Sequence, residues 1–91
     1  MKVVINVCFG GFGLSQAVYD RYNELTGKNV KYQNDITRDD IVLVQVVEEL
    51  GQEANGHHSE LKIVEIPDGI SWFIDDYDGM ETIHETHRTW S

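Results

Sequence analysis

The sequence predicts an α+β fold in which an antiparallel sheet of three to four strands packs with two helices. Three features indicate it: short β-branched runs, two apolar stripes at helical spacing, and an Asp78-Gly79 dipeptide between two strand-like segments. A chain of 91 residues has room for a single domain, residues 1–91. So small a domain has a thin core, which favours assembly as a homo-oligomer.

The first strand and the first helix follow from local signals. An apolar, β-branched run over Lys2–Cys8, broken only by Asn6, is typical of a strand that is buried on both faces. The glycines of residues 9–13 end the strand, because they favour turns with unusual dihedral angles. A helix is then predicted over residues 15–26, with Ser15 as its N-cap and Gly27 just beyond its end.

The middle of the chain contains a second predicted helix. Residues Asn29–Ile36 fit either a loop or a short strand. Thr37 to Asp40 resemble a capping box, so the helix is expected to open there. Its apolar stripe comprises Leu43, Val46, Val47, Leu50 and Ala54. The helix either stops at Gly51 or runs on to the better capping pair Asn55-Gly56.

The end of the chain predicts a β-hairpin. A strand over Leu61–Ile66 is stopped by a Pro-Asp-Gly turn. Ser71–Tyr77 and Met80–His87 then flank Asp78-Gly79, which suits a two-residue type I′ turn.

That turn fixes which residues of the hairpin face each other. The predicted pairs are Tyr77 with Met80, Asp75 with Thr82, Ile74 with Ile83, Phe73 with His84, and Trp72 with Glu85. One face, assigned to the core, carries Trp72, Ile74 and Ile83, and the other carries Phe73, Tyr77, Met80 and His84. Since both faces are apolar, either helices cover both, or the second face meets another subunit or a ligand.

Charge and composition exclude several functions. Seven Lys and Arg residues against sixteen Asp and Glu residues give a net charge of −9, which disfavours duplex nucleic acid and membrane surfaces as partners. A single cysteine, Cys8, allows no intramolecular disulfide and fits a reducing cytoplasm. No apolar run approaches the ~20 residues that cross a bilayer, and the first residues predict a strand rather than a signal peptide.

The Gly-rich segment is the first candidate for a binding site. Residues Phe9-Gly10-Gly11-Phe12-Gly13 join a strand to a helix N-terminus, where free N–H groups and the helix dipole attract phosphate. The segment matches neither the Walker A motif nor the dinucleotide fingerprint. The alternative is a tight connection in which Phe9 and Phe12 fill the core.

No arrangement of residues predicts catalysis. The four histidines, His57, His58, His84 and His87, lack metal-ligand spacing. Cys8 lies in a strand expected to be buried, where a thiol is inert. The sequence therefore predicts a protein that is not an enzyme, with no catalytic residue, metal or cofactor.

The last residues form the second candidate site. Arg88, one of only three arginines, follows His84 and His87 and precedes Trp90. A second arginine, Arg38, lies just before the second predicted helix. A guanidinium suits phosphate, and an aromatic ring can stack on a base. The alternative is that Arg88 pairs with a surface carboxylate and Trp90 packs on the edge of the domain.

Several segments together resemble small proteins encoded by bacteriophages. They are Val4 to Ser15, Val46 to Gly51 with Ala54-Asn55-Gly56, Leu61 to Asp68, and Tyr77-Asp78-Gly79 through His87 to Trp90. The combination is similar to the anti-Thoeris family of sponge proteins and covers most of the chain except about residues 27–36. The resemblance implies a homo-oligomer in the cytoplasm of an infected bacterium. It also implies sequestration, without cleavage, of cyclic ADP-ribose isomers and, in some members, of cyclic oligonucleotides of the CBASS defence system.

Chemistry, rather than alignment with the family, selects the candidate ligand-binding residues. They are Phe9, Gly10, Gly11, Phe12, Gly13, Arg38, His84, His87, Arg88 and Trp90. A second hypothesis is that the acidic protein imitates nucleic acid and blocks a host nuclease or CRISPR effector. A third is an accessory protein without a ligand.

Overall fold

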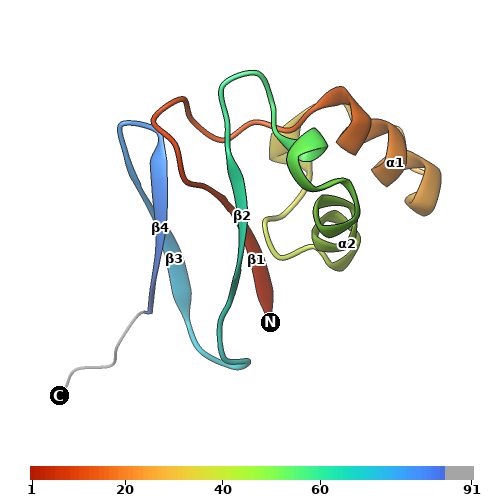
Figure 1. Cartoon of the computed structure of the whole chain (residues 1–91). Helices are drawn as coiled ribbons and strands as arrows, with labels where there is room; N and C mark the ends of the chain where they lie inside the picture. The colour runs from red at the N-terminus through yellow and green to blue at the C-terminus, as the bar shows by residue number, and fades with distance from the viewer. Residues whose placement is uncertain (86–91) are drawn as a thin grey trace, which may run out of the picture.

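The computed structural model describes residues 1–85 as a small α+β fold (Figure 1). Helices α1 (Gln16–Thr26) and α2 (Ile41–Leu50) are accompanied by 3₁₀ turns at Gln33–Asp35 and Gly51–Ala54. Strand β1 (Lys2–Asn6) pairs antiparallel with β2 (Leu61–Glu65), and β3 (Trp72–Tyr77) pairs antiparallel with β4 (Met80–Glu85). The α+β class, two helices and the hairpin are confirmed. The strands, however, form two two-stranded sheets instead of one sheet.

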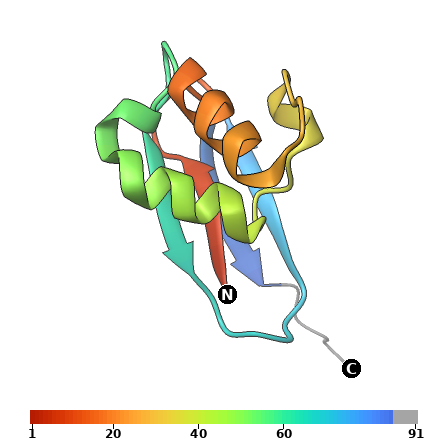
Figure 2. The ribbon, with the colours of Figure 1, turned by 90° about the vertical axis from the view of Figure 1, so that its right-hand side faces the viewer.

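The main core lies between the β1–β2 sheet and the two helices (Figure 2). Val4 of β1 packs with residues of α1 and α2, among them Val18, Tyr22, Leu43 and Val46. Val3 and Ile5 point to the opposite face of β1 and are also buried. The hairpin lies on that side of β1 (Figure 1), so the predicted two-sided burial of this strand is confirmed. The strand ends at Asn6, two residues earlier than predicted, so Cys8 lies in the loop that follows.

Helix α1 has the predicted ends. The Ser15 hydroxyl oxygen accepts a hydrogen bond from the Val18 N–H, and Gly27 has a φ of +72°. The helix is tied to α2 through the Tyr22 hydroxyl, which donates to the Asp40 carboxylate at 2.8 Å.

Helix α2 begins three residues later than the predicted capping box implies. Asp40 is its N-cap, and the Asp40 Oδ1 accepts from the N–H groups of Val42 and Leu43 at 2.8 and 3.1 Å. The prediction of Thr37 as the cap is wrong because the Arg38 carbonyl accepts a hydrogen bond from the Val4 N–H. That bond holds the segment against β1 instead of in the helix.

The end of α2 combines the two alternatives. The α-helix stops at Leu50, Gly51 adopts a φ of +58°, and a tighter 3₁₀ turn continues to Ala54. The segment Asn29–Ile36 contains a 3₁₀ turn and no strand. No helix in residues 1–85 is both long and apolar enough to span a membrane.

The hairpin has the predicted register in every pair. Asp78 and Gly79 both have positive φ angles, 54° and 91°, as a type I′ turn requires. Ser71 lies outside β3, and β4 is described as far as Glu85, so part of the predicted Met80–His87 strand lies outside the described residues.

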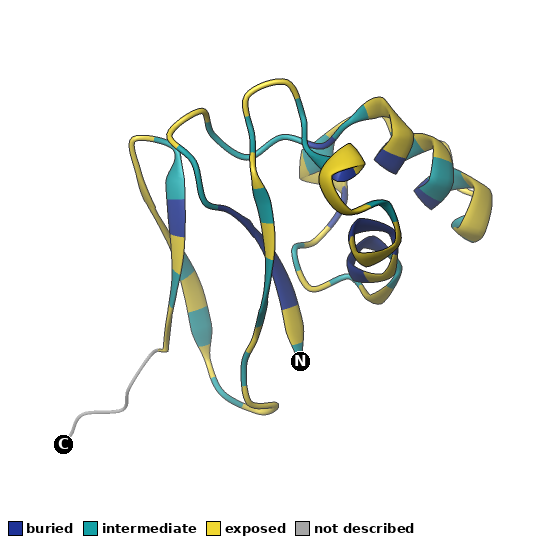
Figure 3. Ribbon diagram, viewed as in Figure 1, coloured by how far each residue is buried: buried dark blue, intermediate teal, exposed yellow. Residues whose placement is uncertain are grey.

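The inner face of the hairpin is less buried than predicted (Figure 3). Trp72, Ile74 and Ile83 are only half-buried, and none belongs to the core cluster. The buried residue on this face is instead Glu81, at 4% exposure. The core assignment fails because the hairpin contacts the body through β4 and the turn, without a helix packed against it.

Candidate ligand-binding site

The Gly-rich loop, residues 9–13, lies between the hairpin turn and the loop of residues 56–59. A Cβ on Gly10 would lie 1.8 Å from the His58 carbonyl oxygen, and one on Gly79 would lie 2.7 Å from that of Phe9. A Cβ on Gly56 would lie 2.8 Å from the Gly13 carbonyl carbon. These glycines are needed because backbone packs directly on backbone, which supports the tight-connection interpretation for Gly10.

A buried amide, Asn6, holds the three segments together. Its Nδ2 donates to the carbonyl oxygens of Cys8 at 2.6 Å and Gly79 at 2.7 Å. Its Oδ1 accepts from the Glu60 N–H at 2.8 Å. The Cys8 Sγ donates to the His58 carbonyl oxygen at 3.0 Å. The loop is therefore fixed at its start by bonds to both neighbours.

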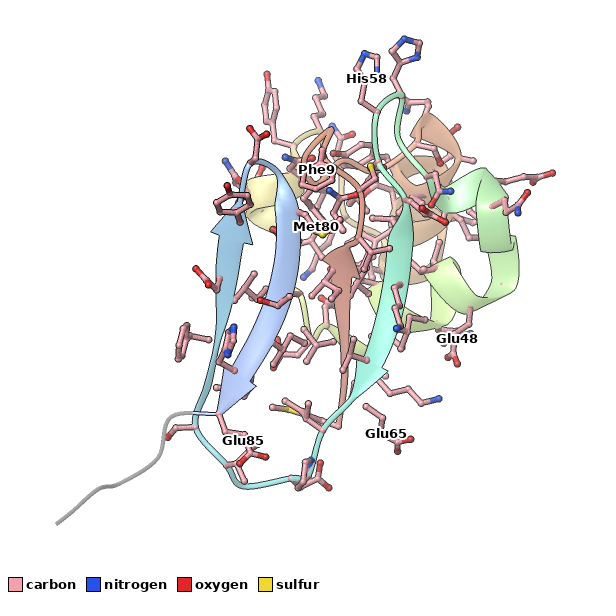
Figure 4. The ribbon with its side chains drawn as sticks, turned by 60° about the vertical axis from the view of Figure 1, so that its left-hand side comes forward. Phe9, Glu48, His58, Glu65, Met80 and Glu85 are labelled. Carbon is pink, nitrogen blue, oxygen red and sulfur yellow. The ribbon has the colours of Figure 1, made fainter. Side chains whose placement is uncertain are left out.

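The two phenylalanines of the loop have different environments. Phe12 is partly buried against the core, and its ring centroid lies 3.5 Å from the Arg38 Cζ. Phe9 is 62% exposed, so the interpretation that it fills the core is wrong. Figure 4 shows Phe9 beside Met80, at the turn end of the hairpin. The loop thus presents an aromatic ring to solvent from a constrained backbone.

Arg38 is engaged by a buried carboxylate. Its Nη1 and Nη2 donate to the Glu81 Oε1 and Oε2 at 2.6 and 2.8 Å. The Nη1 also donates to the Val4 carbonyl oxygen at 3.3 Å. A phosphate could bind this guanidinium only by competing with Glu81, and sequence reasoning missed that pairing. The predicted hairpin register places Glu81 on the face assigned to the core. Because a buried carboxylate needs a partner, this position could have indicated the pairing.

His84 lies on the outer face of the hairpin, away from Arg38. Its ring stacks on that of Phe73 with 5.4 Å between centroids, and its Nε2 lies 2.9 Å from the Thr82 Oγ1. Phe73 is 50% exposed and Tyr77 78% exposed on the same face. The structure therefore offers a second exposed aromatic surface, which is formed by residues other than those of the Gly-rich loop.

The other predicted site residues, His87, Arg88 and Trp90, lie outside the described residues. Within residues 1–85, no group of three or more His, Cys, Asp or Glu side chains is arranged to hold a metal ion. His57 and His58 are exposed neighbours, 4.3 Å apart between ring centroids.

The perturbed side chains support the fold and lie away from the loop. Burial and the hydrogen bond to Asp40 raise the pKa of Tyr22 to about 12. The N-terminal ammonium, 2.6 Å from the Asp68 Oδ1, holds the pKa of that carboxyl below its usual value.

Comparisons with family models, curated proteins and solved structures give no match to this chain. The resemblance to the anti-Thoeris family therefore stays a prediction. The described geometry can stack a planar group on an exposed ring beside backbone N–H groups.

Proposed function

We propose that the protein binds and sequesters cyclic nucleotide immune signals, cyclic ADP-ribose isomers foremost, without cleaving them. The observation that carries the proposal is the placement of Phe9. Its ring is 62% exposed on a loop that Asn6, Gly10 and Gly79 hold in place. A ring presented from a fixed backbone loses little entropy on binding, and base–aromatic stacking contributes about 1–3 kcal/mol per base.

The loop backbone supplies hydrogen-bond donors next to this ring. Among the bonds of residues 1–85, none has the N–H of Gly10, Gly11 or Phe12 as its donor. Such N–H groups ahead of a helix N-terminus suit phosphate oxygens. In this proposal the base stacks on Phe9, and the phosphates accept from the loop.

The proposal gives the two arginines different tasks. Arg38, paired with Glu81 and packed on Phe12, is assigned a positioning role beneath the loop. Direct neutralisation of phosphate is assigned to Arg88. In this proposal, association with further copies of the chain completes the binding site. Such a homo-oligomer is what the thin core led us to expect.

Titration calorimetry with glycocyclic ADP-ribose, cyclic dinucleotides and cyclic trinucleotides tests the proposal. The wild-type protein is expected to bind one of these classes, and Phe9→Ala to weaken binding at least tenfold. Tyr32→Ala is the matched control, because Tyr32 is also an exposed aromatic, at 70%, in a different segment. Absence of heat with every class, or equal losses in both variants, would overturn the proposal.

The charge distribution favours a second candidate, an acidic inhibitor that imitates nucleic acid. Each arginine in residues 1–85 is paired with a carboxylate, Arg21 with Glu24 and Glu49 and Arg38 with Glu81. The hairpin meanwhile exposes four carboxylates, Asp75, Asp76, Asp78 and Glu85. Exposed carboxylates of this kind can attract a basic DNA-binding surface.

Inhibition assays with a purified host nuclease separate the two candidates. Mimicry predicts inhibition that falls steeply with salt, and that the combined variant Asp75→Asn, Asp76→Asn, Asp78→Asn is inactive. A nucleotide sponge predicts no inhibition by either protein.

A further inference from the structure

The β3–β4 hairpin is joined to the rest of the protein differently at its two ends. At one end, residues 66–71 connect β2 to the start of β3, and at the other end lies the hairpin turn (Figure 1). Residues 67–69 of the connection are exposed, and Gly69 has a φ of +81°. No backbone–backbone hydrogen bond within residues 1–85 involves Gly69 or Ile70. The connection can therefore change its backbone angles without breaking such bonds.

The polar links between the hairpin and the body lie toward the turn. Glu81 accepts from the Arg38 guanidinium at 2.6 and 2.8 Å and from the Asn6 N–H at 2.9 Å. The Asn6 Nδ2 donates to the Gly79 carbonyl oxygen at 2.7 Å. We call the Arg38–Glu81 pair and the Asn6–Gly79 bond the latch. The hairpin thus has a pliable connection at one end and the latch near the other.

The latch consists of charged and polar groups instead of a packed apolar surface. Glu81 is 4% exposed, whereas the apolar side chains of the inner hairpin face are only half-buried. When a buried ion pair separates into water, hydration of both charges offsets much of the lost attraction. Opening would also uncover Val3 and Ile5, which are buried on the hairpin side of β1, so the closed form is favoured. Even so, opening exposes less apolar surface than unfolding of the helical core does.

Movement of the hairpin would affect the Gly-rich loop. A Cβ on Gly79 would lie 2.7 Å from the Phe9 carbonyl oxygen and 2.6 Å from the Gly11 nitrogen, so the turn packs directly on the loop backbone. Figure 4 shows Met80, the residue after the turn, beside Phe9. When the turn moves away, the loop keeps contact only with residues 56–59 among these two neighbours.

We propose that the β3–β4 hairpin is a hinged flap, which turns about residues 67–71 and is held closed by the latch. The flap opens as a unit while the β1–β2 sheet and both helices stay folded. The closed flap fixes the backbone that carries Phe9, and the open flap releases it. The inference concerns the chain alone and holds whether or not Phe9 binds a nucleotide.

Amide hydrogen exchange, followed residue by residue by NMR on the full chain without nucleotide, tests the flap. Val4 and Asn6 form a matched pair on one edge of β1, because the Val4 N–H donates to the Arg38 carbonyl and the Asn6 N–H to Glu81. After correction for intrinsic rates, Asn6 is expected to exchange with the hairpin amides, at least about tenfold faster than Val4. Equal protection of Val4, Asn6 and the hairpin would overturn the inference.

Two variants separate opening of the flap from global unfolding. Glu81→Gln removes the charge of the latch and is expected to speed the exchange of Asn6 and the hairpin amides at least about tenfold. Val46→Ala leaves a void in the helical core, and is expected to speed exchange in α2 but not in the hairpin. Circular dichroism checks that each variant is folded. Equal acceleration of α2 and the hairpin in Val46→Ala, or unchanged hairpin exchange in Glu81→Gln, would overturn the inference.

Discussion

The Arg38 guanidinium makes a two-pronged ion pair with the buried carboxylate of Glu81, across 43 residues of sequence. Glu81 also accepts from the Asn6 N–H at 2.9 Å, while the Arg38 carbonyl accepts from the Val4 N–H at 2.9 Å. Both N–H groups lie on the edge of β1 that faces away from β2. The Glu81 carboxylate and the Arg38 carbonyl therefore satisfy two backbone donors on this edge of β1, which pairs with no strand in the described residues.

Removing one partner of this pair should be costly. Glu81→Gln leaves the Arg38 charge without its partner, and we expect a loss of about 2–4 kcal/mol in the free energy of unfolding. Arg21→Gln, which breaks exposed pairs with Glu24 and Glu49, should cost under about 1 kcal/mol. Urea unfolding of both variants measures the difference. Equal losses in the free energy of unfolding would show that the Arg38–Glu81 pair stabilises the protein no more than the exposed pairs do.

The N-cap of α2 gives a second prediction. Asp40→Ala removes the acceptor for two helix N–H groups and the partner of the Tyr22 hydroxyl, so we expect a loss of about 1–2 kcal/mol. Thr37→Ala should change stability by less than about 0.5 kcal/mol. Chemical denaturation of both variants checks the order. A larger effect at Thr37 would contradict the start of α2 at Ile41.

The raised pKa of Tyr22 predicts a dependence on alkaline pH. Because its pKa is about 12 in the folded protein against about 10 when unfolded, the folded state holds the proton more tightly. The stabilising contribution is complete below pH 10 and is lost as the pH rises toward 12. Unfolding free energies measured across that range should fall, and Tyr22→Phe should flatten this part of the slope. An identical slope in Tyr22→Phe would assign the effect to other groups.

The close backbone packing at Gly10 gives a prediction for the loop. Gly10→Ala places a Cβ against the His58 carbonyl oxygen, so the loop must shift and Phe9 must move with it. We expect weaker nucleotide binding together with reduced stability. Gly69→Ala is the control for a loss of stability alone, because its φ of +81° disfavours alanine while its Cβ would have open space, far along the chain from the loop. Comparable loss of binding in both variants would argue against a specific role of the loop.

The sequence was sufficient where structure depends on neighbouring residues. Ser15 and Gly27 cap α1 through local hydrogen bonds, and Asp78-Gly79 determines the register of the whole hairpin. The start of α2 could not be derived in this way, because the bond between Arg38 and Val4 joins segments 34 residues apart. The same limit applies to the candidate site. Burial of Glu81 depends on Arg38, and the exposure of Phe9 depends on how the hairpin turn packs against the loop.

Recovery of the bound ligand tests the central claim most directly. The purified protein is incubated with glycocyclic ADP-ribose, freed of unbound ligand and denatured, and the released small molecule is identified by mass spectrometry. We predict that the intact cyclic molecule is released in stoichiometric amount from the wild-type protein and from Tyr32→Ala, but not from Phe9→Ala. Release of a cleaved product, or no retained nucleotide with this ligand or with cyclic di- and trinucleotides, would contradict the account.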